Sequence, residues 1–299
     1  MASQDSSVRQ VVAADIGGTW MRAAAVSSEG ICGPIVRRPT EATRPREEIV
    51  TDLLAVVEEA ERQAQIERSA VAGLGVGVAT VLDQEGRLTT VPNLGNLGGM
   101  NLRGYLHETR GLPVVVHNDA SCFAVGEWWK GAGKGSRNLC AVTLGTGMGI
   151  GLVIEGRLYE GSHGYAGEIW TTPMEGTFLE NLVRAGAIER HYEGLSGRRL
   201  TGVEVAGLAD DGEAHALSAF AEFGRSLGVV VSFIVNLLDP DVVVFGGAIS
   251  RSARHFMPRV REALLTTTTT RDRARLEVSA LGETAALLGA ARLLWEATQ

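Results

Sequence analysis

The sequence contains little lysine, little cysteine and no apolar signal segment at its start. Only Lys130 and Lys134 are lysines, and its 35 acidic and 28 basic residues give a formal net charge of −7. Because nucleic-acid phosphates bind to basic surfaces, this charge argues against a nucleic-acid partner. The three cysteines lack C-x-x-C spacing, which predicts a reducing, cytoplasmic environment and no cysteine-based metal site.

Long apolar runs are also missing. The most apolar stretch, residues 227–238, has 12 residues and is too short to span a bilayer, so we expect a buried helix there and no membrane partner. A polar N-terminus without an apolar core predicts no secretory signal. The 299 residues suffice for two α/β lobes.

The order of apolar and turn residues predicts a repeated α/β pattern. Three strand-like runs open the chain, an amphipathic helix follows, and two buried strands precede another helix. From about residue 138 the strand, glycine turn, strand pattern begins again, so we expect a duplicated fold with lobes at residues 1–136 and 137–299. The expected strands are 11–15, 21–26, 31–37, 71–80, 112–119 and 241–249, and the expected helices are 45–64, 120–133, 178–192, 214–238, 253–264 and 284–297. The threonine run 266–270 is expected to be a surface turn or strand approach.

The first glycine turn joins two apolar runs and reads Asp15-Ile-Gly17-Gly18-Thr19. Glycine allows backbone N–H groups to approach an anion, and the threonine hydroxyl adds a donor. A carboxylate beside phosphate suggests Mg²⁺, which prefers carboxylate and phosphate oxygens. The alternative is a plain Gly-Gly hairpin turn.

A second glycine turn, "TLGTGMGIG", contains Gly145, Thr146 and Gly147. Glycine at every second position of a strand is costly unless a backbone or ligand approaches closely. The turn is not a P-loop, because no Gly-Lys-Ser/Thr follows, and it is not a dinucleotide-binding turn, because another strand follows it. A glycine-rich strand crossing remains the alternative.

Carboxylates and amides stand at two further places. Asn118 and Asp119 lie where a buried strand ends and a helix begins, and Asp119 is a candidate general base for a substrate hydroxyl. The alternative is that they cap the helix. Glu168 and Glu180 are candidates for binding a polyol, although both are also compatible with solvated surface acids.

The motifs "DIGGT", "NDA", "LGTGMGIG", "GYAGE", "GTFLE", "VVVFGGAIS" and "GETAALLGAA" resemble, in this order, the ROK family of repressors and sugar kinases. The resemblance covers about residues 11–295. It implies an α/β, actin-like or hexokinase-type (ribonuclease H-like) duplicated two-lobe fold with a central cleft for ATP, Mg²⁺ and sugar. It also implies a cytoplasmic enzyme, and we expect a homodimer.

The resemblance assigns roles residue by residue. Asp119 would be the catalytic base, and Asp15 would face Mg²⁺, directly or through water. The implied contacts to ATP and its phosphates are Asp15, Gly17, Gly18, Thr19, Gly145, Thr146, Gly147, Gly246 and Gly247. The implied contacts to sugar are Asn93, Asn118, Glu168, Glu180, Thr80 and Trp170.

The sequence departs from the family around the sugar. Trp170 and Thr171 replace the usual Gly-His pair, and the zinc cysteines are absent, so we expect no zinc site. Ala79-Thr80 replaces Pro-Gly, and His117 and Ser121 flank the Asn-Asp-Ala motif. These changes lead us to expect an unusual acceptor.

We expect an ATP-dependent kinase for the primary (6-type) hydroxyl of a hexose-like sugar, leaning to an amino-hexose such as kanosamine. The alternatives are an ordinary glucokinase, a C7-cyclitol kinase, and a non-catalytic sugar-sensing regulator. A transcription regulator of the same family would need an N-terminal helix-turn-helix, and only about ten residues precede the first expected strand.

Overall fold

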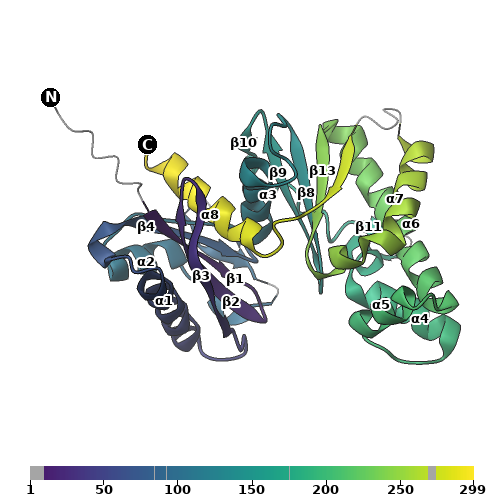
Figure 1. Ribbon diagram of the computed structural model, residues 1–299, viewed down its shortest axis with the longest axis horizontal. Helices are drawn as coiled ribbons and strands as arrows, with labels where there is room; N and C mark the ends of the chain where they lie inside the picture. The colour runs from purple at the N-terminus through teal and green to yellow at the C-terminus, as the bar shows by residue number, and fades with distance from the viewer. Residues whose placement is uncertain (1–9, 84, 92, 175, 269–273) are drawn as a thin grey trace. The chain divides into compact units, whose positions relative to one another are not determined.

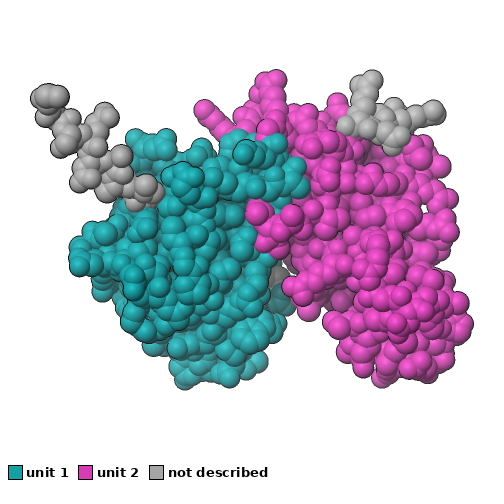
Figure 2. Space-filling view, viewed as in Figure 1, with its two compact units in different colours: residues 1–134, 158–166, 283–299 teal, residues 135–157, 167–282 magenta. Residues whose placement is uncertain are grey.

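The computed structural model describes residues 10–299 except residues 84, 92, 175 and 269–273. The described chain forms two compact units, coloured separately in Figure 2. Unit 1 contains residues 1–134, 158–166 and 283–299, and unit 2 contains residues 135–157 and 167–282. Each unit is built on one five-stranded sheet.

The sheet of unit 1 has the strand order β3-β2-β1-β4-β7. Figure 1 labels β1, β2, β3 and β4 of this sheet. Strands β1, β2 and β3 are antiparallel neighbours, and β4 and β7 run parallel to β1. The strands are β1 Gln10–Ile16, β2 Trp20–Ser27, β3 Gly30–Pro39, β4 Val71–Val78 and β7 Val114–Asn118, and the helices are α1 Arg46–Gln63, α2 Leu102–Arg110, α3 Asp119–Lys130 and α8 Thr284–Ala297. A small antiparallel pair, β5 Val81–Leu82 and β6 Leu88–Thr90, follows β4.

Two helical layers cover the sheet of unit 1. Helices α1 and α2 pack apolar side chains such as Leu53 and Leu106 against one face. Helices α3 and α8 cover the other face at close range, because a Cβ atom at Gly75 of β4 would overlap the carbonyl of Ala290 in α8. Gly289 allows an equally close approach of α8 to Cys122 in α3. Glycine at these positions therefore fixes the two helices against the sheet and each other.

The sheet of unit 2 repeats this topology, with the order β10-β9-β8-β13-β14. β8 and β9 are antiparallel, and β13 and β14 run parallel to β8. Its strands are β8 Leu139–Leu144, β9 Met148–Ile154, β10 Arg157–Leu158, β13 Val242–Gly246 and β14 Arg275–Val278, and its helices are α4 Ala185–Ser196, α5 Gly202–Asp210, α6 Ala214–Leu238 and α7 Ala253–Thr267. The expected duplication is therefore present in the strand order of both units.

Two expectations need correction. The expected helix over 178–192 is a short strand β12 Thr177–Phe178, a 3-10 helix Leu179–Leu182 and then α4, because the backbone N–H groups of Leu179 and Glu180 bond to Thr172 and Trp170 and not along a helix. The division at residue 136 also differs from the compact units. Helix α8 belongs to unit 1, where it packs on α3 and β4. Residues 158–166 also belong to unit 1.

Helix α6 is long and apolar enough to cross a membrane by length and composition, but half of its most apolar window is buried within unit 2. Residues 227–238 are thus the second half of a 25-residue helix whose inner face belongs to a core. Most of the threonine run 266–270 falls either at the end of α7 or outside the described residues.

Candidate active site

The sheet of unit 1 brings two acidic residues from distant parts of the sequence together. Asp15 stands near the carboxyl end of β1, opposite Gly77 of the parallel strand β4. Asp119 is the first residue of α3, directly after β7. A Cβ atom at Gly77 would lie 3.7 Å from the Asp119 Cα, so Gly77 lies close to Asp119 as well as opposite Asp15. Carboxyl ends of parallel strands are the usual place for ligands in α/β units.

The surroundings of Asp15 disfavour the charged form of its carboxyl group. Burial and the negative charge of Asp119 raise its pKa from 3.8 to about 7, although Arg22 opposes the shift. Arg22 donates from Nη1 to Asp15 Oδ2 at 3.0 Å and from Nε to Glu283 Oε2 at 2.9 Å. Glu283 also pairs with Arg37. A second cation at Asp15 would therefore be favourable.

Mg²⁺ fits this arrangement. It binds through one or two carboxylates together with substrate phosphates and water, and does not need a cage of protein ligands. Asp15 supplies such a carboxylate beside a glycine turn. Among the described residues, no group of three or more His, Cys, Asp or Glu side chains gathers as a metal site.

The turn between β1 and β2 is shaped by a close backbone approach. A Cβ atom at Gly18 would lie 2.7 Å from the Asn93 Cβ and 3.1 Å from its carbonyl oxygen, so only glycine fits. Gly17 donates its N–H to Trp20 O at 2.9 Å, and Thr40 Oγ1 donates to Gly17 O at 2.8 Å. Thr19 is exposed. The structure thus brings three of the predicted residues, Gly17, Gly18 and Asn93, into one small region.

Asn118 caps helix α3. Its Oδ1 accepts from the N–H groups of Ala120 at 2.8 Å and Ser121 at 3.1 Å, and its Nδ2 donates to Thr80 O at 2.9 Å. The Thr80 side chain is buried and donates to Val81 O at 3.0 Å. Both residues therefore position the start of α3, which carries Asp119, and a role in sugar binding remains a prediction for them.

Glu180 hydrogen-bonds to the glycine turn of unit 2. Its Oε1 accepts the N–H of Met148 at 3.1 Å, and a Cβ atom at Gly147 would stand 2.5 Å from the same oxygen. Gly145 donates its N–H to Gly147 O at 2.9 Å, and the space where its Cβ would stand is open. Glu180 thus orders the predicted phosphate turn containing Gly145, Thr146 and Gly147.

Glu168 and Trp170 form a pair. The indole Nε1 donates to Glu168 Oε2, while burial raises the pKa of Glu168 against the opposing effect of this hydrogen bond. The single N–H of Trp170 is therefore used within the protein. Gly247, at the end of β13, has a φ of 82°, and a side chain there would overlap the backbone of Leu144. Gly247 thus allows the chain to pass close to Leu144 of β8, and Gly246 pairs with Thr143 of the same strand.

Sequence reasoning missed three charged residues near these sites. Arg22 is the cross-strand partner of Asp15, and a hairpin centred between Gly18 and Thr19 would have revealed it. Glu283 belongs to the motif "GETAALLGAA", but the motif assigned it no role, and the residue is remote in sequence from Arg22. Glu160 accepts a hydrogen bond from His117 Nδ1 at 3.0 Å, which lowers the pKa of Glu160.

The duplicated sheets, each with a glycine turn between its first two strands, define a two-unit α/β protein of the actin-like class. A model of the ROK family matches residues 11–297, and the chain belongs to this family.

Three proteins illustrate the relationship. The chain is 28% identical to the glucokinase of Halalkalibacterium halodurans, over 94% of this chain and 93% of that one. It is 28% identical to an N-acetyl-D-glucosamine kinase of Photobacterium profundum, over 79% of this chain and 83% of that one. The crystal structure of a ROK family glucokinase from Streptomyces griseus in complex with glucose and AMPPNP superposes with a TM-score of 0.82, at 26% identity, over 96% of this chain and 99% of that one.

Proposed function

We propose that this protein, a ROK family sugar kinase and thus a phosphotransferase, transfers the γ-phosphoryl group of ATP to the primary hydroxyl of a hexose-like sugar. The observation that carries the proposal is the acidic pair Asp15 and Asp119, brought to the carboxyl edge of the unit 1 sheet beside the glycine turn. The relatives named as glucokinase and N-acetyl-D-glucosamine kinase support this class of reaction.

Asp119 would accept the proton of the attacking hydroxyl. Asp119 is the first residue of α3 and directly follows β7, so its carboxylate has a fixed position at the carboxyl edge of the sheet, beside the glycine turn. The turns at Gly17–Gly18 and Gly145–Gly147 would bind donor phosphates through backbone N–H groups. Asp15 would hold Mg²⁺, which neutralises charge on the phosphates during transfer. The reaction then depends mainly on positioning and electrostatic stabilisation.

Glu168 and Glu180 are the proposed contacts to acceptor hydroxyls, together with Asn93, Asn118, Thr80 and Trp170. The Glu168–Trp170 hydrogen bond supports a changed acceptor site, because the indole N–H already has a partner and offers the sugar only an apolar surface. Carboxylates also suit an ammonium group. We therefore favour an amino-hexose such as kanosamine, or another unusual acceptor, over plain glucose.

A coupled ADP-release assay tests the acceptor. We expect kcat/KM for an amino-hexose to exceed that for glucose by at least about tenfold. A site whose polar groups match the hydrogen-bonding groups of one sugar discriminates by up to ~10⁴-fold against sugars that leave these polar groups unpaired. Cyclitols provide the comparison for the C7 alternative. If glucose is the best substrate of the panel, the result favours an ordinary glucokinase. If no polyol is phosphorylated, the result contradicts the proposed kinase activity.

A further inference from the structure

One row of residues crosses the sheet of unit 1 at the level of Asp15. Arg37 of β3 pairs with Arg22 of β2, and Arg22 pairs with Asp15 of β1. Asp15 in turn lies opposite Gly77 of β4. Residues directly opposite each other in neighbouring strands place their side chains on the same face of a sheet. The row therefore sets two arginines beside the carboxylate that is the proposed ligand of Mg²⁺.

Glu283 lies between the two positive charges of this row. Like charges directly opposite each other destabilise a sheet, unless a carboxylate pairs with both. Glu283 does so, because its Oε2 accepts from Arg22 Nε at 2.9 Å and its Oε1 accepts from Arg37 Nη2. Glu283 directly precedes α8, and α8 approaches β4 closely at Gly75. The packing of this helix thus gives the Glu283 carboxylate a fixed position beside the sheet.

Arg22 connects this carboxylate to Asp15. Its Nε donates to Glu283, and its Nη1 donates to Asp15 Oδ2 at 3.0 Å. The side chains of Arg22 and Asp15 are 22% and 13% exposed, so water and salt screen their interaction little. A planar guanidinium group bonded to two carboxylates has one orientation, whereas a lysine ammonium at the same place is a point charge. The arginine therefore fixes Asp15 Oδ2 and leaves Oδ1 as the oxygen available to a cation.

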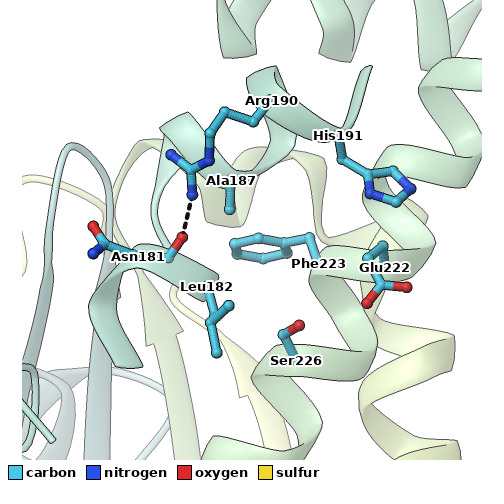
Figure 3. A pocket seen from close by; sticks show the side chains of 8 residues that line it. All are labelled: Asn181, Leu182, Ala187, Arg190, His191, Glu222, Phe223 and Ser226. Atoms are coloured by element: carbon cyan, nitrogen blue, oxygen red, sulfur yellow. Dashed lines mark hydrogen bonds between the residues drawn. The ribbon is translucent and has the colours of Figure 1, made fainter. Parts of the chain in front are cut away.

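Arg190 of unit 2 provides a contrast within the same chain. It lines a cavity of about 320 Å³, and its Nη2 donates to the backbone carbonyl of Asn181 at 2.5 Å (Figure 3). This acceptor is neutral, so the bond orients no carboxylate. Arg22 instead joins two carboxylates, one on β1 and one at the start of α8. The bonds of Arg22 are therefore those expected of a group that orients Asp15.

We propose that Arg22 is a positioning residue for Asp15 in Mg²⁺ binding and that Glu283 acts through Arg22. The inference rests on the proposed function for the role of Asp15, and it gives β2 and the start of α8 a part in metal binding that the family resemblance did not assign. Groups that orient a metal ligand typically contribute about 10–100-fold to metal affinity. A role of Arg22 as a mere charge predicts the opposite effect, because a nearby positive charge repels Mg²⁺ and its removal would strengthen binding.

Binding of a fluorescent analogue of AMPPNP in the absence of sugar tests the proposal. The readout is the Mg²⁺ concentration that gives half of the Mg²⁺-dependent binding. We expect Arg22→Lys and Arg22→Gln each to raise this concentration by about tenfold or more. Glu283→Gln should raise it by about threefold or more, a smaller effect because Arg22 keeps its bond to Asp15. Arg37→Gln is the matched control, since Arg37 bonds to the same carboxylate but lies one strand further from Asp15, and it should leave the concentration unchanged.

A double-mutant cycle tests whether the effect depends on Asp15. In the Asp15→Asn background, Arg22→Lys should change the required Mg²⁺ concentration by less than about twofold, because the carboxylate that Arg22 orients is already absent. The full effect of Arg22→Lys in this background would contradict the proposed role. Circular dichroism checks the fold of each variant. If Arg22→Gln does not fold, Arg22→Lys and Glu283→Gln still decide the question, because each retains one charged or polar group at its position.

Three results would overturn the inference. A lower Mg²⁺ requirement in Arg22→Gln would show that Arg22 acts only as a charge. Weaker binding without Mg²⁺, at an unchanged Mg²⁺ requirement, would show that Arg22 contacts the phosphates itself. A Mg²⁺ requirement within about twofold of the original in the Arg22 variants, or no effect of Mg²⁺ on the unaltered protein, would show that Arg22 has no part in metal binding. The expected pattern in a protein that phosphorylates no sugar would support the positioning role and contradict the proposed function alone.

Discussion

At the scale of single residues, the central prediction concerns Asp119. Its carboxylate is positioned by the first turn of α3, where Ala120 N–H donates to its Oδ1 at 2.9 Å. We expect Asp119→Asn to lower kcat by at least about 10²-fold, since an amide cannot accept the hydroxyl proton and general-base assistance is typically worth 10²–10⁴-fold. Coupled ADP release gives the rate. An unchanged circular dichroism spectrum confirms the fold, and a variant with nearly full activity would exclude Asp119 as the base.

Asp15 gives a prediction about pH. Its pKa is raised from 3.8 to about 7, so the folded protein binds more protons than the unfolded chain between these values. Asp15 therefore contributes a loss of stability as the pH rises through this window.

Asp15→Asn removes that loss while abolishing the proposed Mg²⁺ ligand. We expect the substitution to change the free energy of unfolding in the stabilising direction by about 1–3 kcal/mol more at pH 8 than at pH 5. This range lies below the energy of the complete pKa shift, which is about 1.4 kcal/mol per pKa unit. Urea unfolding at both pH values without Mg²⁺ measures this. An equal stability difference at the two pH values would show that Asp15 is charged throughout.

At the scale of elements, the hairpins and glycine turns could be predicted from the sequence because their signals are local. Alternation of apolar residues and the placement of Gly17, Gly18, Gly145 and Gly147 define them. The helix expected over 178–192 is confirmed only from Ala185 onward, within α4. Its first part differs because the backbone N–H groups of Leu179, Glu180 and Ala185 bond to Thr172, Trp170 and Gly145, none of which a periodic pattern reveals.

The same limit applies to Glu180, whose hydrogen bond with the Met148 N–H of the glycine turn no local pattern reveals. Asn118 differs, because its capping of α3 involves the nearby Ala120 and is the alternative that the sequence offered. Contacts of both residues to a sugar remain predictions. Side-chain roles that depend on a neighbour remote in sequence require the tertiary structure.

The crossing of α3 and α8 yields a stability prediction. Gly289 of α8 has no room for a Cβ, because the atom would overlap the carbonyl of Cys122. We expect Gly289→Ala to destabilise unit 1 by about 1–3 kcal/mol through overpacking. Gly194→Ala in α4 is the matched control. Its Cβ meets open space, so helix propensity should stabilise unit 2 by up to ~1 kcal/mol. Urea unfolding followed by circular dichroism should give opposite signs, and equal effects would contradict the close packing.

At the scale of the whole molecule, one topology carries two different sets of groups. Unit 1 holds the acidic pair and its glycine turn, and unit 2 holds the second turn and the Glu168–Trp170 pair. The duplication could be predicted from the repeated turn pattern. The return of α8 to unit 1 could not, since it depends on the fit of Gly75, Gly126 and Gly289 against backbone of other elements.

The last prediction concerns metals in the whole protein. A structural zinc site requires about four thiolate, imidazole or carboxylate ligands, and the sequence lacks the family's zinc cysteines. We therefore expect chelators to leave the Tm unchanged while they abolish kinase activity, which added Mg²⁺ alone should restore. A structural metal contributes directly to folding, so its removal would lower the Tm by several degrees, at about 2–4 °C per kcal/mol for a domain of 150–250 residues. Calorimetry with and without chelator, alongside the coupled assay, separates these outcomes. A fall in Tm that zinc reverses would reveal a ligand set that the sequence does not indicate.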